Sequence, residues 1–534
     1  MDRLQKLPIG IQTFDDIRND GYLYVDKTKY LIDLIDRGKV YFLSRPRRFG
    51  KSLTVSTFDA LFSGKKELFK GLAAEEFFER PDYRTYPVVR LDMSNVTMNM
   101  GIGSLISSMM DRMKGNAEGL GVKISEVSPG EAFFSLLQQT SEKYNTRVVV
   151  LVDEYDSPIL TNIDSPDKIE EAREILRDIY KRIKTGEQYI HFVFITGISK
   201  FSKVGVFSSL NNLRDISMSD DYASMLGYTE EELLVVFGDH IEDIARRMEI
   251  PKEELLSQIR AYYDGFSFNG ETMLYNPFST LCFLSDRKFS NYWFESGTPA
   301  FIARYMKDKK LTVEQFRGYE VPYDFASCPG DIETATASSF LYQSGYLSLR
   351  PGGLDDFSLD YPNHEVLTAM SSLLIGNIFG SHEAFSSARI SFRESIVNGD
   401  AEGVQGEFNK LLSKIPYDDY AKTAEYAVRR GGDAREWIYR STILSYIYGV
   451  GLDVEAEVHG SKGRADMVVK FRGHIWVMEF KMTKHFASAA ECAGAALAQI
   501  KEKGYADSFD EAVLLGLAID DDLRKITEIR ADKK

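Results

Sequence analysis

The stretch Val40-Tyr-Phe-Leu-Ser-Arg-Pro-Arg-Arg-Phe-Gly-Lys-Ser-Leu53 joins an apolar run, a turn and the sequence Gly50-Lys51-Ser52. The apolar run predicts a strand over residues 40–43, and the residues after the turn predict a helix that starts at Gly50. A strand, a turn and a helix N-terminus in this order are the setting of a phosphate-binding loop, or P-loop. The usual loop has an earlier glycine five positions before Gly50, where this chain has Arg45.

The residues of this loop have distinct predicted roles. Gly50 and the backbone N–H groups around it would face the phosphates of ATP, and Lys51 would reach the β- and γ-phosphates. The Ser52 hydroxyl would bind Mg²⁺. Arg47 and Arg48 are predicted to contact phosphate or a lid. Because Gly-Lys-Ser at a helix start also occurs by chance, the prediction of a nucleotide site needs support from other strands of the same domain.

Apolar strands alternate with helical stretches from Val40 to about Ile216, which predicts an α/β fold with a parallel sheet covered by helices on both faces. Strands are expected at residues 40–43, 88–93, 147–152, 191–196 and 213–218. Helices are expected between them, for example at residues 130–143 and 167–183.

Acidic and hydroxyl side chains lie at the ends of two of these strands. Val149-Val-Leu-Val-Asp-Glu154 is a buried strand that ends on two acids. Asp153 would hold Mg²⁺ and Glu154 would polarise the attacking water, although two acids can also simply cap a strand. Thr196 could place a hydroxyl near the γ-phosphate as a sensor, or could belong to a turn of small residues.

The middle of the chain carries no predicted chemistry. Aromatic clusters between residues 219 and 350 indicate a mostly helical lid, and Phe340-Leu-Tyr-Gln-Ser-Gly-Tyr-Leu-Ser-Leu349 is typical of a winged-helix fold. Residues 351–430 are predicted to form a helical connector. The expected domains are therefore 1–218, 219–350, 351–430 and 431–534.

The last domain is predicted to contain a helix with Glu436, three successive strands at residues 454–459, 465–471 and 474–480, a helix with Gln499 and a final strand at 512–519. If the second and third strands form a hairpin, Asp466 lies across from Glu479 and close to Lys481. Two carboxylates converging on one point bind a hard divalent cation such as Mg²⁺, with Mn²⁺ as an alternative. A lysine beside them can orient water for phosphodiester hydrolysis.

Glu-x-Lys alone is a weak signal, because alternating charged positions on an exposed strand produce it often. Here the apolar run Ile475-Trp-Val-Met478 leads into Glu479, which places the acid at the end of a buried strand. Glu436 and Gln499 stand in the right order along the chain to support the site. These features favour a metal site over an exposed strand.

Composition limits the class of protein. The chain has 534 residues, a net charge of -15 and three widely spaced cysteines, Cys282, Cys328 and Cys492. The acidic charge argues against a broadly basic nucleic-acid binder but not against a local basic groove. The sequence predicts reduced thiols, no signal peptide and no membrane span, and hence a cytoplasmic protein.

Several motifs together resemble the bacterial and archaeal family that joins an AAA-ATPase-like P-loop domain to a C-terminal PD-(D/E)XK nuclease domain. They are Tyr24-Val-Asp-Lys-Thr28, Arg45-Pro-Arg-Arg-Phe-Gly-Lys-Ser52, Val152-Asp-Glu-Tyr-Asp156, Tyr275-Asn-Pro277, Tyr342-Gln-Ser-Gly-Tyr346, Gly463-Arg-Ala-Asp466 and Glu479-Phe-Lys481. Arg45-Pro-Arg-Arg-Phe49 resembles the family's own form of the phosphate loop, so the resemblance implies that the first glycine is absent. The resemblance implies that Lys51, Ser52, Asp153 and Glu154 serve the ATPase. It further implies a nuclease triad of Asp466, Glu479 and Lys481, supported by Glu436 and Gln499. Family members often have a histidine after the helix tyrosine, where this chain has Arg440 after Tyr439.

These residues point to two alternative functions. The first is an ATP-binding and ATP-hydrolysing domain coupled to a Mg²⁺-dependent nuclease, with nucleic acid as partner and DNA favoured over RNA. The second is a nucleotide-controlled switch or scaffold whose last domain holds nucleic acid without cutting it. ATPases of this kind often complete their site with an arginine from a neighbouring subunit, so the sequence allows a homo-oligomer without requiring one.

Overall fold

The computed structural model describes residues 4–94, 96, 98, 101–162, 165–200, 206–207, 210–297, 313–322, 325, 337–353, 356–415, 434–460 and 463–534. The P-loop segment forms a strand, a turn and a helix. β1 (Val40–Ser44) is buried along its whole length, and α3 (Lys51–Phe62) begins directly after Gly50. Gly50 has a φ of 92°, a left-handed backbone conformation that residues other than glycine rarely adopt.

Five parallel strands form the first sheet, in the order β2-β3-β4-β1-β5. The other four are β2 (Val88–Asp92), β3 (Val148–Asp153), β4 (Ile190–Gly197) and β5 (Arg214–Asp215). The predicted parallel sheet is thus confirmed. β5 is shorter than expected because the backbone N–H of Ser44 donates to the Ser217 hydroxyl (2.9 Å) instead of extending the ladder.

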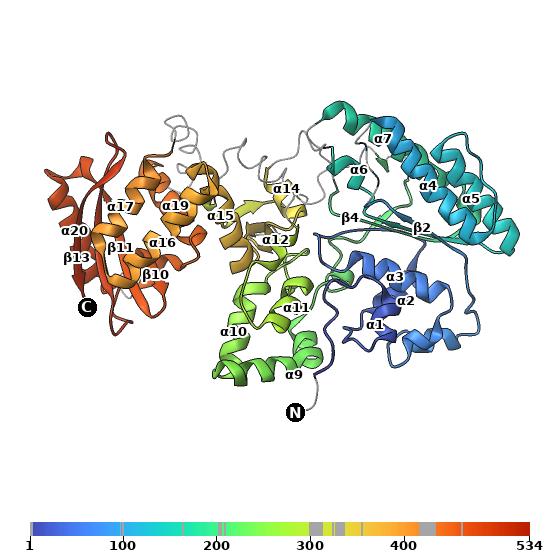
Figure 1. Cartoon of the computed structure of the whole chain (residues 1–534), viewed down its shortest axis with the longest axis horizontal. Helices are drawn as coiled ribbons and strands as arrows, with labels where there is room; N and C mark the ends of the chain where they lie inside the picture. Colours follow the sequence, from blue (N-terminus) through green and yellow to red (C-terminus); the bar gives the residue numbers. More distant parts are fainter. Residues whose placement is uncertain are drawn as a thin grey trace. The chain divides into compact units, whose positions relative to one another are not determined.

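Helices cover both faces of this sheet (Figure 1). On one face lie α1 (Phe14–Asn19), α2 (Thr28–Arg37) and α3, and on the other lie α4 (Ile102–Leu120), α5 (Pro129–Tyr144) and α7 (Pro166–Thr185). β3 contributes alternate residues to the two hydrophobic cores, with Val150 and Val152 on one side and Val149 and Leu151 on the other. Burial on both faces explains the uninterrupted apolar run.

The middle of the chain is mainly helical. It contains α9 (Glu230–Met248), α10 (Lys252–Tyr263), α11 (Pro277–Asp286), α12 (Tyr292–Gly297) and α14 (Ala337–Gln343). α14 is followed by β7 (Ser348–Pro351) and β8 (Phe357–Asp360), which with β6 (Tyr319–Val321) form a three-stranded antiparallel sheet in the order β6-β8-β7. The helix, glycine turn and strand expected at residues 340–349 are present.

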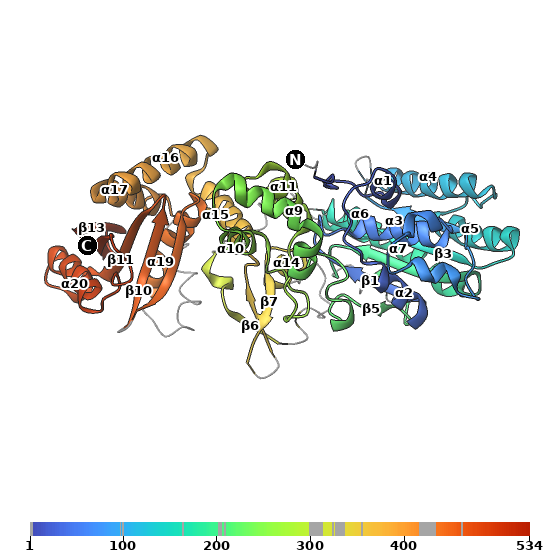
Figure 2. The same cartoon turned by 90° about the horizontal axis from the view of Figure 1, so that it is seen from below.

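The C-terminal sheet is mixed, with the order β13-β12-β11-β10-β9. Its strands are β9 (Asp453–Gly460), β10 (Gly463–Phe471), β11 (His474–Met482), β12 (Val513–Asp520) and β13 (Lys525–Lys533). α20 (Ala489–Glu502) lies on one face, while α16 (His382–Asn398) and α17 (Ala401–Leu412) lie on the other (Figure 2). α19 (Ala434–Gly449) packs beside β9 and β11. α15 (His364–Phe379) lies against the end of α19, where the Ser372 hydroxyl donates to the Gly449 carbonyl (2.7 Å).

The chain divides into two compact units, residues 1–297 with 318–365 and residues 298–317 with 366–534. The four-domain division stays a prediction, and its last boundary, at 430/431, lies outside the described residues. Cys282 and Cys492 are buried free thiols, while Cys328 also lies outside the described part. None of the helices in the described ranges is long and apolar enough to cross a membrane.

Candidate functional site

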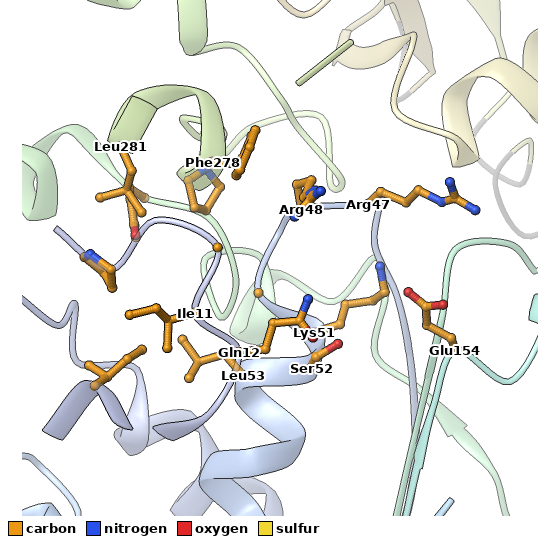
Figure 3. Close-up of a pocket in the computed structure, with 16 residues that line it drawn as sticks. Ile11, Gln12, Arg47, Arg48, Lys51, Ser52, Leu53, Glu154, Phe278 and Leu281 are labelled. Carbon is orange, nitrogen blue, oxygen red and sulfur yellow. The ribbon is translucent and has the colours of Figure 1, made fainter. Parts of the chain in front are cut away.

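A cavity of about 400 Å³ opens beside the P-loop (Figure 3). Arg47, Lys51, Ser52 and Glu154 lie at one end of it. The apolar side chains of Ile11, Phe278 and Leu281 lie toward the other end. The cavity is also lined by Pro8, Gln12, Ile17, Leu53, Tyr228 and Pro277. A charged end beside a helix N-terminus and an apolar end match the two halves of a nucleotide, its phosphates and its base.

Lys51 is almost completely buried at the charged end. Its Nζ donates to the carbonyl oxygens of Arg45 (3.0 Å) and Pro46 (2.9 Å), both in the loop itself. Burial lowers the pKa of the Lys51 ammonium, and the negative charges of Glu154, Asp153 and Asp156 act in the opposite direction. A buried cation in this position is stabilised by an anion such as phosphate.

Asp153 and Thr196, from neighbouring strands, are joined by a hydrogen bond at the carboxyl end of the sheet. The Thr196 hydroxyl donates to Asp153 Oδ1 (2.8 Å), and both side chains are buried. Glu154 is the next residue and has a φ of 51°, the left-handed region, which turns its side chain into the cavity. Burial raises the pKa of the Glu154 carboxyl, while the charge of Lys51 lowers it.

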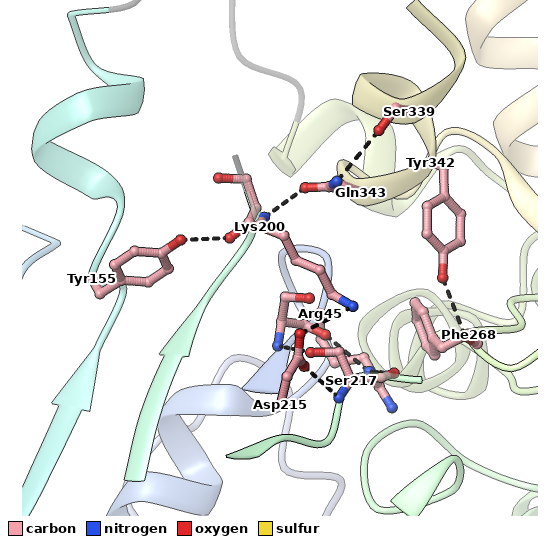
Figure 4. A network of polar contacts seen from close by, with 11 residues as sticks. Arg45, Tyr155, Lys200, Asp215, Ser217, Phe268, Ser339, Tyr342 and Gln343 are labelled. Carbon is pink, nitrogen blue, oxygen red and sulfur yellow. Dashed lines mark hydrogen bonds and ion pairs between the residues drawn. The ribbon is translucent and has the colours of Figure 1, made fainter. Parts of the chain in front are cut away.

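Asp156 and Tyr155 hold the end of β4, a role that the sequence did not indicate. The buried Asp156 carboxylate accepts from the Ser199 backbone N–H (2.7 Å), the Ser199 hydroxyl (2.8 Å) and the Ile198 N–H (3.1 Å). The Tyr155 hydroxyl donates to the Ser199 carbonyl (2.8 Å). In the same network the Lys200 N–H donates to Gln343 Oε1 of α14 (2.6 Å; Figure 4).

Arg45, at the position of the missing glycine, is a structural residue. Its guanidinium is buried and donates to the carbonyl oxygens of Ser44 (2.9 Å) and Ser217 (2.7 Å; Figure 4). It also lies 4.1 Å from the centre of the Phe268 ring. Burial lowers its pKa to about 10. A side chain thus anchors the loop to the end of β5 and to the middle region.

Arg48, predicted to contact phosphate or a lid, lines the same cavity and lies beside Phe278 of α11. Its guanidinium is 4.6 Å from the centre of the Phe278 ring. Phe278 is in the first turn of α11, which Asn276 caps by accepting from the Ser279 N–H (3.0 Å). The motif Tyr275-Asn-Pro277 therefore sets the start of the helix that closes this end.

The C-terminal triad comes together on the β10–β11 hairpin. The Asp466 N–H donates to Glu479 Oε2 (3.3 Å), and the Phe480 N–H donates to Asp466 Oδ2 (2.8 Å). Strand residues alternate between faces, so Glu479 and Lys481 share the α20 face with Val477, while Trp476 points to α16, where its Nε1 donates to the Ile396 carbonyl (3.1 Å).

Gln499 of α20 joins the two ends of the Glu-x-Lys motif. Its Oε1 accepts from Lys481 Nζ (2.7 Å), and its Nε2 donates to Glu479 Oε1. α20 approaches the sheet closely over Gly516, the partner of Glu479 on β12. A Cβ at Gly516 would lie 2.5 Å from the Leu497 backbone nitrogen, so a side chain there would push the helix and Gln499 away.

The neighbouring helix α19 contributes Arg440 and Glu436. Arg440 Nη1 is 3.2 Å from Asp466 Oδ1, so the residue that departs from the family pattern pairs with a predicted metal ligand. Burial raises the pKa of the Cys492 thiol to about 11, the charge of Lys481 lowers it, and the charge of Glu436 raises it. The supporting role of Glu436 stays a prediction.

The donor set of this site suits a divalent cation. Burial and repulsion from Asp466 raise the pKa of Glu479 to about 8. A metal ion between the two carboxylates would offset both effects. The number of protein ligands is small, however. Among the described residues, no three His, Cys, Asp or Glu side chains converge on one point.

We expect Mn²⁺ binding at this site to strengthen with pH. Because the Glu479 carboxyl must lose its proton to bind metal, affinity in the absence of nucleotide should rise by about tenfold per pH unit up to pH ~8 and then level off. Calorimetric titration of the full chain at pH 6, 7 and 8 measures this, with Asp466→Asn identifying the signal of this site. Equal affinity at all three values would contradict the prediction.

Arg440 is expected to compete with the metal. Arg440→Gln removes the cation paired with Asp466, so Mn²⁺ should bind about tenfold more tightly. The same titration gives the affinity, with Arg530→Gln on β13 as an exposed control that leaves it unchanged. Weaker binding in Arg440→Gln would instead mean that the ion pair orients Asp466 for the metal.

Comparison with known proteins agrees with the two domains. Residues 8–207 match the family described as predicted AAA-ATPase, and residues 434–528 match the PD-(D/E)XK nuclease superfamily. The chain is 36% identical over 536 residues to the "Uncharacterized protein in vnfD 5'region" of Azotobacter chroococcum mcd 1, an alignment that spans 98% of each protein. The chain therefore belongs to the family that joins an AAA-ATPase-like domain to a C-terminal PD-(D/E)XK nuclease domain.

Proposed function

We propose that this protein binds and hydrolyses ATP in its N-terminal domain and cuts nucleic-acid phosphodiesters with its C-terminal domain, using Mg²⁺ at both sites. The observation that carries the proposal is the connected set Asp466, Glu479, Gln499 and Lys481 on one face of the C-terminal sheet. The buried Glu479 carboxylate, the partly buried Asp466 carboxylate beside it and a lysine connected through Gln499 favour catalysis over simple binding of nucleic acid.

At the ATP site, Lys51 would bind the β- and γ-phosphates and Glu154 would accept a proton from the attacking water. Ser52 and Asp153 would hold Mg²⁺, which neutralises charge that develops on the phosphates. The Thr196 hydroxyl, bonded to Asp153, would sense the γ-phosphate. The adenine base would lie at the apolar end, between Ile11 and Phe278 and within reach of Gln12.

At the nuclease site, Asp466 and Glu479 would hold the divalent cation, which would supply activation of water and neutralisation of charge at the scissile phosphate. Lys481 would orient the attacking water and stabilise negative charge on the scissile phosphate. Gln499 keeps the Lys481 ammonium beside Glu479 through its two hydrogen bonds. Deprotonation of Glu479 would precede metal binding, since its pKa is raised to about 8.

The test is cleavage of supercoiled plasmid, linear duplex, single-stranded DNA and RNA by the full chain. Each substrate is incubated with Mg²⁺ or Mn²⁺, with and without ATP, and ATP turnover is measured in parallel. We expect metal-dependent cleavage of DNA. No cleavage under any condition, with ATP still bound, would support a nucleotide-controlled switch that holds nucleic acid without cutting it.

A further inference from the structure

The three arginines of the P-loop have three different environments. Arg45 is buried against main-chain carbonyls, and Arg48 stacks on Phe278 at the apolar end of the cavity. Arg48 has a φ of 66°, so the backbone reverses between it and Arg47. Arg47 consequently lies on the other side of the loop, at the end of the cavity that contains Lys51 and Glu154 (Figure 3).

The backbone at Arg47 is fixed from the middle region. Trp293 Nε1 donates to the Arg47 carbonyl (2.9 Å), and this tryptophan is fully buried. The backbone N–H of Trp293 donates to Glu365 Oε1 (2.7 Å). Pro46, the preceding residue, packs on Gly345, where a Cβ would come within 2.7 Å of the proline ring. The Arg47 side chain therefore starts from a point that packing holds in place.

The charge of Arg47 acts on the phosphate end of the cavity. It lowers the pKa of Lys51 and also that of Glu154. All three residues line the same cavity. Within the described part of the chain, no hydrogen bond or ion pair occupies the Arg47 guanidinium. A cation that forms no hydrogen bond or ion pair with the described residues, next to a buried lysine, is an arrangement suited to a polyphosphate.

We propose that Arg47 contacts the γ-phosphate and supplies, within the same chain, the arginine that many P-loop ATPases receive from a neighbouring subunit. This inference rests on the proposed ATP site. The guanidinium would stabilise the negative charge that moves onto the phosphate oxygens as the bond to the β-phosphate breaks and the water activated by Glu154 attacks. One chain would then contain a complete site.

Arg47→Ala tests the catalytic role. We expect kcat for ATP hydrolysis to fall by about 100-fold or more, while affinity for ADP changes by less than about threefold, because ADP lacks the γ-phosphate. Arg47→Lys should recover part of the loss. Arg177→Ala, at a partly exposed arginine of α7 that pairs with Glu170, should behave as wild type. Arg48→Ala should raise KM rather than lower kcat. An unchanged kcat in a folded Arg47→Ala protein would overturn the inference.

A mixing experiment separates action within the chain from action across subunits. Arg47→Ala and Lys51→Ala chains are co-expressed, so that any oligomer contains both. Action within the chain predicts no recovery above the two variants alone, whereas recovered hydrolysis would place Arg47 in a neighbour's site and overturn the inference. If the wild type binds ATP without hydrolysing it, binding measurements test the same contact. Arg47→Ala should then weaken the binding of ATP but not that of ADP. Binding of neither nucleotide by the wild type would refute the proposed function itself.

Discussion

Lys481→Ala is expected to lower the rate of metal-dependent DNA cleavage by about two to four orders of magnitude. The Lys481 ammonium donates to Gln499, which in turn donates to Glu479, so the substitution removes the only lysine in that connected set. It also removes a positive charge that lowers the pKa of Glu479. The measurement is single-turnover cleavage of linear and supercoiled DNA with saturating Mg²⁺ or Mn²⁺.

Two variants make this result specific. Lys501→Ala changes an exposed lysine of α20 that pairs with Asp532, and it should cut at the wild-type rate. Gln499→Leu should keep the lysine but release it from Glu479, which predicts an intermediate rate. Undiminished cutting by Lys481→Ala would rule out this site as the nuclease centre.

Lys51→Ala is expected to lower ATP turnover by about 100-fold or more and to weaken ATP binding. The buried Lys51 ammonium lies at the same end of the cavity as Glu154. It now donates hydrogen bonds to the loop carbonyls, and with ATP bound it would donate them to the phosphates instead. Because burial lowers its pKa, the charged group destabilises the nucleotide-free fold, so its removal should not unfold the protein. Turnover and calorimetric ATP binding give the two quantities.

Lys66→Ala, on the exposed side of the same unit, is the matched control and should leave both quantities unchanged. Wild-type turnover in Lys51→Ala would refute the ATP site. The nuclease activity of Lys51→Ala answers a separate question. Cleavage lost together with ATP binding would mean that nucleotide gates the cut, and unaffected cleavage would mean that the two domains act independently.

The sequence determined the elements that carry each site. The apolar run before Arg45 and the run that ends at Asp153 are local patterns, and strands buried on both faces require such runs whatever lies beside them. The same holds for β11, where Ile475-Trp-Val-Met478 precedes Glu479. Period-two alternation then put Glu479 and Lys481 on one face, which the hydrogen bonds of Gln499 bear out.

Only the tertiary structure decided which partners these residues have. Trp293 and Arg47 are 246 positions apart, and Lys200 and Gln343 are 143 apart, so no local pattern relates them. The separation of Arg47 from Arg48 depends on a backbone reversal and on the position of Phe278. The pairing of Arg440 with Asp466 depends on how α19 packs beside the hairpin. Side-chain spacing along one strand or helix is fixed by backbone geometry, whereas contacts between elements are fixed by packing of the whole core.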